Sequence, residues 1–246
     1  MLERIVALAH RAGEAILKVY ETDFDVARKS DDSPVTQADL AAHHLIAEGL
    51  REFDPDTPLI SEEGDLPPYE ARRNWARFWL VDPLDGTKEF VKRNGEFTVN
   101  IALIEGGRPV LGVVHAPVKA LTYYASSQGG AWKREGDGPP QRLASRRADP
   151  GRPLVVVSSR SHGSEKLAAF LAQYEVKEHL HAGSSLKFCL VAEGRADVYP
   201  RFGPTMEWDV AAGDCVYRHA AERGEHPSPL RYNKPDLRND GFVIGL

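Results

Sequence analysis

The sequence of 246 residues predicts a mixed α and β protein of two halves, an α+β half at residues 1–135 and an α/β half at residues 153–246. In the first half, two amphipathic helical segments precede a run of strand signals separated by glycine turns. In the second half strands and helices alternate, which is typical of a layered α/β fold. Residues 136–152 are rich in Gly, Pro and Arg, and we expect them to connect the halves.

The first half begins with two predicted helices. Apolar residues recur at helical spacing over residues 2–19, which predicts an amphipathic helix. Thr36 is a candidate N-cap for a second helix that runs to about residue 53. Asp39, in the first turn of that helix, falls on its apolar face. An acid facing inward is unexpected there unless a cation lies opposite it.

The remaining elements follow from strand periodicity and helical spacing. In the first half, strands are predicted at 59–61, 77–81, 97–104, 109–115 and 121–125, the last three as an antiparallel meander, with a short helix after Thr87. In the second half, strands are predicted at 154–157, 196–199 and 241–244, and helices at 165–174, 186–192 and 209–219.

The composition limits the class of protein. A formal net charge of -5 disfavours a nucleic-acid polymer as partner, since such a partner requires a basic face. No apolar run has membrane-spanning length, and the N-terminus lacks the pattern of a secretory signal. Cys189 and Cys215 are expected to be free thiols in a reducing compartment. We therefore expect a cytoplasmic protein; the sequence leaves open a peripheral association with the inner face of the membrane, and the oligomeric state.

The segment Asp82-Pro83-Leu84-Asp85-Gly86-Thr87 indicates a metal loop at the end of a strand. Its proline stiffens the turn and its glycine permits a backbone shape that other residues resist. Two carboxylates and the carbonyl between them can then converge on one point, and Mg²⁺ prefers such oxygen ligands. A plain surface turn explains this segment equally well when it is taken alone.

Three further acids bear on that choice. Glu62 follows a short predicted strand, Asp209 lies at a predicted helix start, and Asp39 faces inward. A solvated acid pair explains Glu62 and an N-cap explains Asp209 on structural grounds alone. Asp39 fits a purely structural explanation least well.

Three motifs resemble the signatures of the inositol monophosphatase superfamily of lithium-sensitive, magnesium-dependent phosphatases. They are Ser61-Glu62-Glu63, the stretch 79–87 and the stretch 207–213, in the superfamily's order and spanning nearly the whole chain. The resemblance implies a layered αβαβα sandwich of the sugar-phosphatase type. The stretches 88–103 and 183–194 resemble the 3'(2'),5'-bisphosphate nucleotidase branch of that superfamily.

The resemblance also implies roles for individual residues. The magnesium ligands would be Glu62, Asp82, Leu84 (through its carbonyl), Asp85 and Asp209, with two or three Mg²⁺ in each active site. The catalytic pair would be Thr87, which orients the attacking water, and Asp39, which accepts the threonine proton. The substrate would contact Glu62, Leu84, Asp85, Gly86, Thr87, His162, Ser184, Lys187, Arg201 and Asp209.

The implied activity is hydrolysis of a small phosphorylated nucleotide, adenosine 3',5'-bisphosphate, to AMP and phosphate, in nucleotide recycling during sulfur assimilation. Whether 3'-phosphoadenosine 5'-phosphosulfate is also a substrate stays open. One alternative is an inositol-1-phosphate phosphatase, and another is a non-catalytic metal- or nucleotide-binding protein of the same fold. No G-x-S-x-G elbow and no Walker loop occur, which disfavours the corresponding hydrolase and nucleotide-binding classes. The pairs His43/His44 and His179/His181 lack convincing ligand spacing, and we expect structural roles for them.

Overall fold

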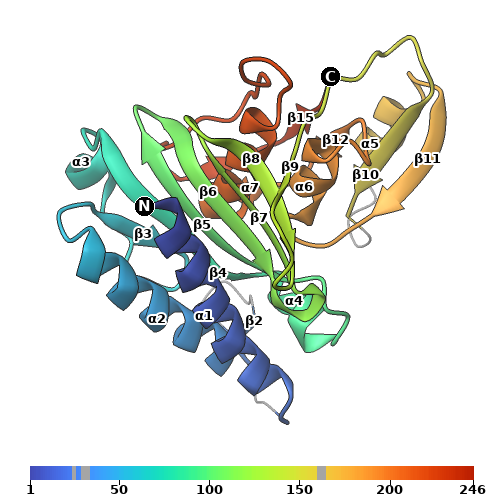
Figure 1. The fold of residues 1–246 in the computed structure, drawn as a ribbon. Coiled ribbons are helices and arrows are strands. Elements are labelled where there is room, and N and C mark those ends of the chain that lie inside the picture. The colour runs from blue at the N-terminus through green and yellow to red at the C-terminus, as the bar shows by residue number, and fades with distance from the viewer. Residues whose placement is uncertain (24–25, 29–33, 160–164) are drawn as a thin grey trace.

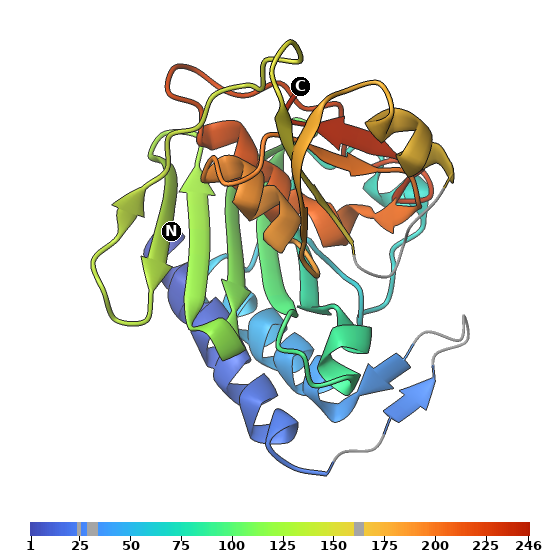
Figure 2. The ribbon, with the colours of Figure 1, turned by 90° about the vertical axis from the view of Figure 1, so that its right-hand side faces the viewer.

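The computed structural model describes residues 1–23, 26–28, 34–159 and 165–246, which form five layers (Figures 1 and 2). Helices cover both faces of a central sheet, and a layer of two two-stranded sheets with one further helix lies beyond them. The expected αβαβα sandwich is therefore confirmed.

The first layer consists of α1 (Leu2–Tyr20) and α2 (Gln37–Phe53), close to the predicted bounds. Thr36 is the N-cap of α2, as predicted. Its hydroxyl accepts from the Ala38 amide at 3.1 Å, and its own amide donates to the Asp39 carboxylate at 2.8 Å. This capping box fixes where α2 begins and holds Asp39, 1% exposed, against the sheet.

The second layer is a seven-stranded sheet in the order β3-β4-β5-β6-β7-β8-β9. Strands β3 and β4 are parallel and all other neighbours are antiparallel. The strands are β3 (Leu59–Ser61), β4 (Arg77–Asp85), β5 (Thr98–Glu105), β6 (Arg108–Ala116), β7 (Leu121–Ser126), β8 (Gly130–Glu135) and β9 (Gln141–Arg142).

Helices on both sides explain why the central strands are continuously apolar. In β4, Phe78 and Leu80 pack toward α6 and α7, whereas Trp79 and Val81 pack toward α1 and α2. Every residue from Phe78 to Leu84 in this strand is buried. The end of β4 that carries Asp82 is therefore held by packing on both faces of the sheet.

Three predictions for the first half need correction. Strand β4 does not end at residue 81 but continues through a register shift to Asp85, which still pairs with Thr98. Strands β8 and β9 were not predicted, because a polar, half-exposed strand gives little hydrophobic signal. Strand β9 lies inside residues 136–152, so the central sheet extends into the expected connection.

The third layer consists of α6 (Leu186–Ala192) and α7 (Glu207–His219), which pack on the central sheet. Beyond α6 lie the parallel pair β10 (Leu154–Ser158) and β11 (Val176–His181) and the antiparallel pair β12 (Tyr199–Arg201) and β15 (Phe242–Ile244). Helix α5 (Glu165–Leu171) packs on the outer side of β10. The shorter elements are β1 (Val26–Arg28), β2 (Pro34–Thr36), α3 (Tyr69–Arg72), α4 (Thr87–Val91), a 3₁₀ turn at Pro117–Lys119, β13 (Thr205–Met206) and β14 (Arg238–Asn239).

The second half also departs from its predictions in detail. Helix α5 ends at residue 171 rather than 174, the strand expected at 196–199 lies at 199–201, and the last strand begins at residue 242. Helix α7 begins two residues earlier than predicted, at Glu207. Strand β11 was missed because its residues are almost all exposed and lack alternation. Among the helices of the described residues, none has the length and apolar character needed to span a membrane.

The close approach of β6 to α7 makes Gly112 a test of this packing. A Cβ at Gly112 would lie 2.8 Å from the Ala212 carbonyl oxygen and 2.6 Å from the Cys215 Cβ. We expect Gly112→Ala to lower the free energy of unfolding by about 1–3 kcal/mol, as overpacking does, in urea denaturation. The control Gly151→Ala lies at an exposed turn where only the Asp149 carboxylate is near. Unchanged stability of Gly112→Ala would contradict the packing.

Candidate metal centre

Carboxylates from separate stretches of the chain meet at the end of β4. Oxygens of Glu62, Asp82 and Asp209 all lie within 4.8 Å of one another. Glu62 directly follows β3, and its amide donates to the Val81 carbonyl at 3.1 Å, which ties it to β4. Asp209 is the third residue of α7, where its carboxylate accepts from the Met206 amide at 2.8 Å. Asp209 is therefore not the N-cap; Met206 occupies that position.

The loop after Asp82 has the tight shape expected of it. The Asp82 carboxylate accepts from the Leu84 amide at 3.0 Å, and Asp82 is 1% exposed. Gly86 has φ of 94°, in the left-handed region, and a Cβ there would lie 2.4 Å from the Ser184 hydroxyl oxygen. The alternative of a plain surface turn fails because Asp82, Pro83 and Leu84 are buried and the next three residues are only partly exposed.

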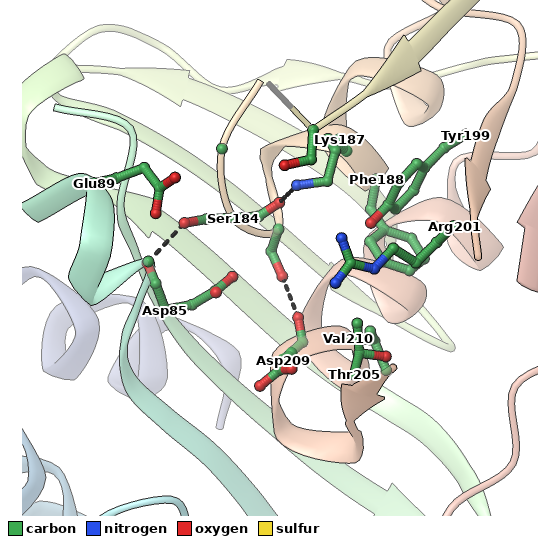
Figure 3. Close-up of a pocket in the computed structure, with 14 residues that line it drawn as sticks. Asp85, Glu89, Ser184, Lys187, Phe188, Tyr199, Arg201, Thr205, Asp209 and Val210 are labelled. Carbon is green, nitrogen blue, oxygen red and sulfur yellow. Dashed lines mark hydrogen bonds between the residues drawn. The ribbon is translucent and has the colours of Figure 1, made fainter. Parts of the chain in front are cut away.

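Asp85 links the loop to two other elements. Its backbone carbonyl accepts from the Ser184 hydroxyl at 2.7 Å (Figure 3), and its carboxylate accepts from the Asn100 amide at 3.3 Å. The carboxylate faces the pocket that Asp209 also lines. The structure thus brings Asp85 beside the Glu62, Asp82 and Asp209 cluster.

Asp39 and Thr87 form a hydrogen-bonded pair at the same place. One oxygen of Asp39 accepts from the Thr36 amide and hydroxyl, at 2.8 and 2.7 Å. Its other oxygen accepts from the Thr87 hydroxyl at 3.2 Å. Thr87 is the first residue of α4, so the turn that forms the loop also aims its hydroxyl.

Crowding of acids that are buried or partly buried has an electrostatic cost in this cluster. Burial raises the pKa of Asp39, and it raises the pKa of Asp82 and Asp209 well above their ordinary range. Repulsion among Glu62, Asp82, Asp85 and Asp209 adds to the shifts of Asp82 and Asp209. Burial raises the pKa of Asp85 to about 6, against the opposing effect of the Lys187 charge. A divalent cation would remove both penalties, and the all-oxygen donor set fits a hard cation.

A pocket next to the carboxylates contains two cationic side chains, Lys187 and Arg201 (Figure 3). Lys187 is only 6% exposed, so it is a buried cation and not a solvated charge on the surface of α6. Its ammonium donates to the Ser184 carbonyl at 2.7 Å and lies 5.5 Å from the centre of the Tyr199 ring. Burial lowers its pKa to about 8. The Arg201 guanidinium donates to the Gly203 and Pro204 carbonyls at 3.2 and 3.1 Å, which orients it along the pocket wall.

The predicted site residues that the structure describes converge on one region. The four acids predicted as metal ligands, together with Leu84, Thr87 and Asp39, lie in or beside the loop, and Gly86, Ser184, Lys187 and Arg201 line the adjoining pocket. His162 lies outside the described residues. His43 contacts the Ser61 hydroxyl at 2.9 Å, and His179 contacts the Ser158 hydroxyl at 2.8 Å.

Two polar residues at the centre were missed, Asn100 and Ser185. Asn100 is 1% exposed and stands in the apolar strand β5, and Ser185 is 2% exposed at the start of α6. One signal was present in the sequence: a single amide within an otherwise apolar strand run. The hydrogen-bond partners of Asn100 include Ser185, which is far away in the chain, so no local sequence pattern could identify it.

Comparison with known proteins shows the family to which this chain belongs. The model of the inositol monophosphatase family matches residues 1–222. The chain therefore belongs to the inositol monophosphatase family, whose members are metal-dependent phosphatases.

Individual relatives narrow the comparison. The chain is 57% identical over 228 residues to the 3'(2'),5'-bisphosphate nucleotidase CysQ of Salmonella typhimurium, covering 92% of this chain and 89% of that protein. It is 52% identical over 254 aligned positions to the CysQ nucleotidase of Escherichia coli K12, covering both chains completely. The crystal structure of CysQ from Bacteroides thetaiotaomicron superposes with a TM-score of 0.82 at 42% identity, covering 98% of this chain and 95% of that one.

The raised pKa values predict how stability depends on pH without metal. At pH values between the ordinary and the folded pKa, the folded protein keeps protons that the unfolded chain has released. These bound protons stabilise the folded state. Their contribution is complete below the ordinary pKa of 3.8, and it is lost as the pH rises through the pKa in the folded protein, which is about 6 for Asp85. We therefore expect the Tm in EDTA to fall across this range, and Mg²⁺ to restore it most at neutral pH. A Tm in EDTA that stays level or rises would contradict the cluster's electrostatics.

One substitution tests the repulsion among the carboxylates of the cluster. Asp82→Asn keeps the acceptor for the Leu84 amide but removes one charge. We expect it to raise the Tm of the metal-free protein at neutral pH by at least about 2 °C, the shift that ~1 kcal/mol gives a domain of this size. It should also abolish stabilisation by Mg²⁺. The control Asp65→Asn, on an exposed residue, should change neither. An unchanged response to Mg²⁺ would remove Asp82 from the metal centre.

Proposed function

We propose that this protein is a magnesium-dependent phosphomonoesterase that hydrolyses adenosine 3',5'-bisphosphate to AMP and phosphate. The observation that carries the proposal is that a crowded carboxylate cluster adjoins a pocket that contains two cations, Lys187 and Arg201. The first suits metal-assisted attack on one phosphate, and the second suits recognition of another. The names of the CysQ relatives, at 52–57% identity, support this substrate class.

The metal ligands that we propose are the carboxylates of Glu62, Asp82, Asp85 and Asp209 together with the Leu84 carbonyl. Hard oxygen donors of this kind suit Mg²⁺, as they do Ca²⁺ and Mn²⁺. When bound, magnesium supplies two effects, acidification of a water and neutralisation of charge on the phosphoryl group. Two or three ions per site are consistent with the number of carboxylates.

Thr87 and Asp39 would orient the attacking water. Because Asp39 accepts the Thr87 hydroxyl hydrogen, the lone pairs of Thr87 remain to accept a hydrogen bond from water. Asp39 is itself held by Thr36 on its other oxygen, so the pair is fixed before substrate arrives. Such positioning carries much of the rate in phosphoryl transfer.

The second phosphate would lie against the cationic pocket. The planar guanidinium of Arg201 suits two phosphate oxygens, and Lys187 acts as a point charge. Gly86 and Ser184 lie against each other in the wall of this pocket. At the adjoining metal centre, the scissile phosphate would meet Glu62, Leu84, Asp85, Thr87 and Asp209. His162 stays a candidate substrate contact from the sequence. 3'-Phosphoadenosine 5'-phosphosulfate presents the same 3'-phosphate and a longer anion, so we propose it as a second substrate.

The other two hypotheses are less well supported. Inositol 1-phosphate has no second phosphate, so it would leave the pocket cations without an anionic partner. A non-catalytic protein of this fold has no need of the Thr87–Asp39 pair, which this chain retains with 3.2 Å geometry.

A substrate panel tests the proposed function. With Mg²⁺, we expect kcat/KM for adenosine 3',5'-bisphosphate to exceed that for inositol 1-phosphate by at least about tenfold, a difference of ~1.4 kcal/mol. Adenosine 3'-monophosphate, which lacks the second phosphate, should show a raised KM. Phosphate release should stop in EDTA. A higher kcat/KM for inositol 1-phosphate would overturn the assignment.

A charge-removing variant tests the chemistry of the centre. We expect Asp85→Asn to lower kcat by at least about a hundredfold, the scale of losing one element of transition-state electrostatics. Asp65→Asn removes the same charge from an exposed residue and should keep the wild-type kcat. Wild-type turnover by Asp85→Asn, measured by phosphate release at saturating substrate, would exclude Asp85 from the metal site.

A further inference from the structure

Asn100 is a buried amide in the middle of the apolar strand β5, between Val99 and Ile101, and it is 1% exposed. A buried amide is costly unless its hydrogen-bonding groups are satisfied. The adjacent residues Val99 and Ile101 are buried and apolar, but Asp82 pairs with Asn100 across the sheet, and Thr98 lies on the same face of β5. The contacts of Asn100 therefore indicate why it is there.

The side chain of Asn100 joins the metal loop to helix α6. Its amide nitrogen donates to the Asp85 carboxylate at 3.3 Å and to the Ser185 hydroxyl at 3.1 Å. Its oxygen accepts from the Thr98 hydroxyl at 3.0 Å. The Ser185 hydroxyl in turn donates to the Asp209 backbone carbonyl at 2.6 Å.

The chemistry of these partners requires a donor at position 100. An ionised Asp85 carboxylate can only accept hydrogen bonds. The Ser185 hydroxyl has one hydrogen, which the Asp209 carbonyl takes, so it offers only lone pairs to Asn100. The NH₂ group of an amide meets both demands at once, and the remaining oxygen suits the Thr98 hydroxyl.

We propose that Asn100 is a positioning residue of the metal centre. It orients the Asp85 carboxylate and, through Ser185, fixes the first turn of α7 that carries Asp209. One side chain thereby sets two ligands that are more than a hundred residues apart in the sequence. This inference rests on the proposed function only in that both acids are taken as metal ligands.

A neutral donor is suited to this task. A lysine or arginine at position 100 would cancel the Asp85 charge that attracts the cation, and an aspartate would add repulsion to a crowded cluster. An apolar residue would leave the Asp85 carboxylate without this donor. Partners of this kind around a metal site typically change metal affinity or activity by about 10–100-fold when they are removed.

Calorimetric titration with Mg²⁺ tests the proposal without substrate. We expect Asn100→Ala and Asn100→Asp each to raise the Kd for Mg²⁺ by at least about tenfold. The matched control is Thr122→Val, which removes another buried polar group of the sheet, bonded to His10 and His115 instead. It should keep the wild-type Kd. A positioning role also predicts that excess Mg²⁺ restores part of the kcat of Asn100→Ala, which a purely structural role does not predict.

Wild-type Mg²⁺ affinity in both Asn100 variants would overturn the proposal. If neither variant folds, Ser185→Ala decides, because it removes a single oxygen from the same chain of hydrogen bonds. A weaker Mg²⁺ affinity in Ser185→Ala supports the proposal, and an unchanged affinity contradicts it. Failure of the proposed substrate is a separate result, since it would leave these Mg²⁺ affinities unaffected and appear only in phosphate release.

Discussion

Repulsion among carboxylates crowded at the end of β4 is the constraint on which the rest of this structure depends. Glu62, Asp82 and Asp209 bring oxygens within 4.8 Å of one another, and burial with mutual repulsion raises the pKa values of Asp82 and Asp209. Such an arrangement persists only because the surrounding layers hold it rigidly, and it is relieved when a cation binds. Binding of a cation would therefore be favoured by the repulsion that it relieves.

The fold supplies that rigidity from both sides of one strand. Strand β4 is packed by α1 and α2 on one face and by α6 and α7 on the other, so its end is a fixed platform. The register shift before Asp85 and the left-handed Gly86 turn the chain there, which points Thr87 back toward Asp39. The same packing places the first turn of α7 opposite the loop.

Much of this was predictable from the sequence, for identifiable reasons. The helices α1 and α2 and the inner strands have strong periodicity because they bury one or both faces. The loop at Asp82 is local, so the sequence indicated a metal loop there, but a surface turn explained the segment equally well until the fold showed Asp82, Pro83 and Leu84 to be buried. Strands β8, β9 and β11 were missed because exposed strands carry little apolar pattern. Asn100 could not be assigned because its partners come from distant segments, and only the packed fold brings them together.

The most direct measurement is the number of protons released when Mg²⁺ binds, obtained calorimetrically in buffers of different ionisation enthalpy. Carboxyl groups whose pKa is raised in the metal-free protein must release their protons to the buffer when the cation binds. We expect proton release near pH 6, the region of the Asp85 pKa of about 6, and less release as the pH rises. Mg²⁺ binding with no proton release at that pH, or no Mg²⁺ binding, would contradict a metal centre built from repelling acids.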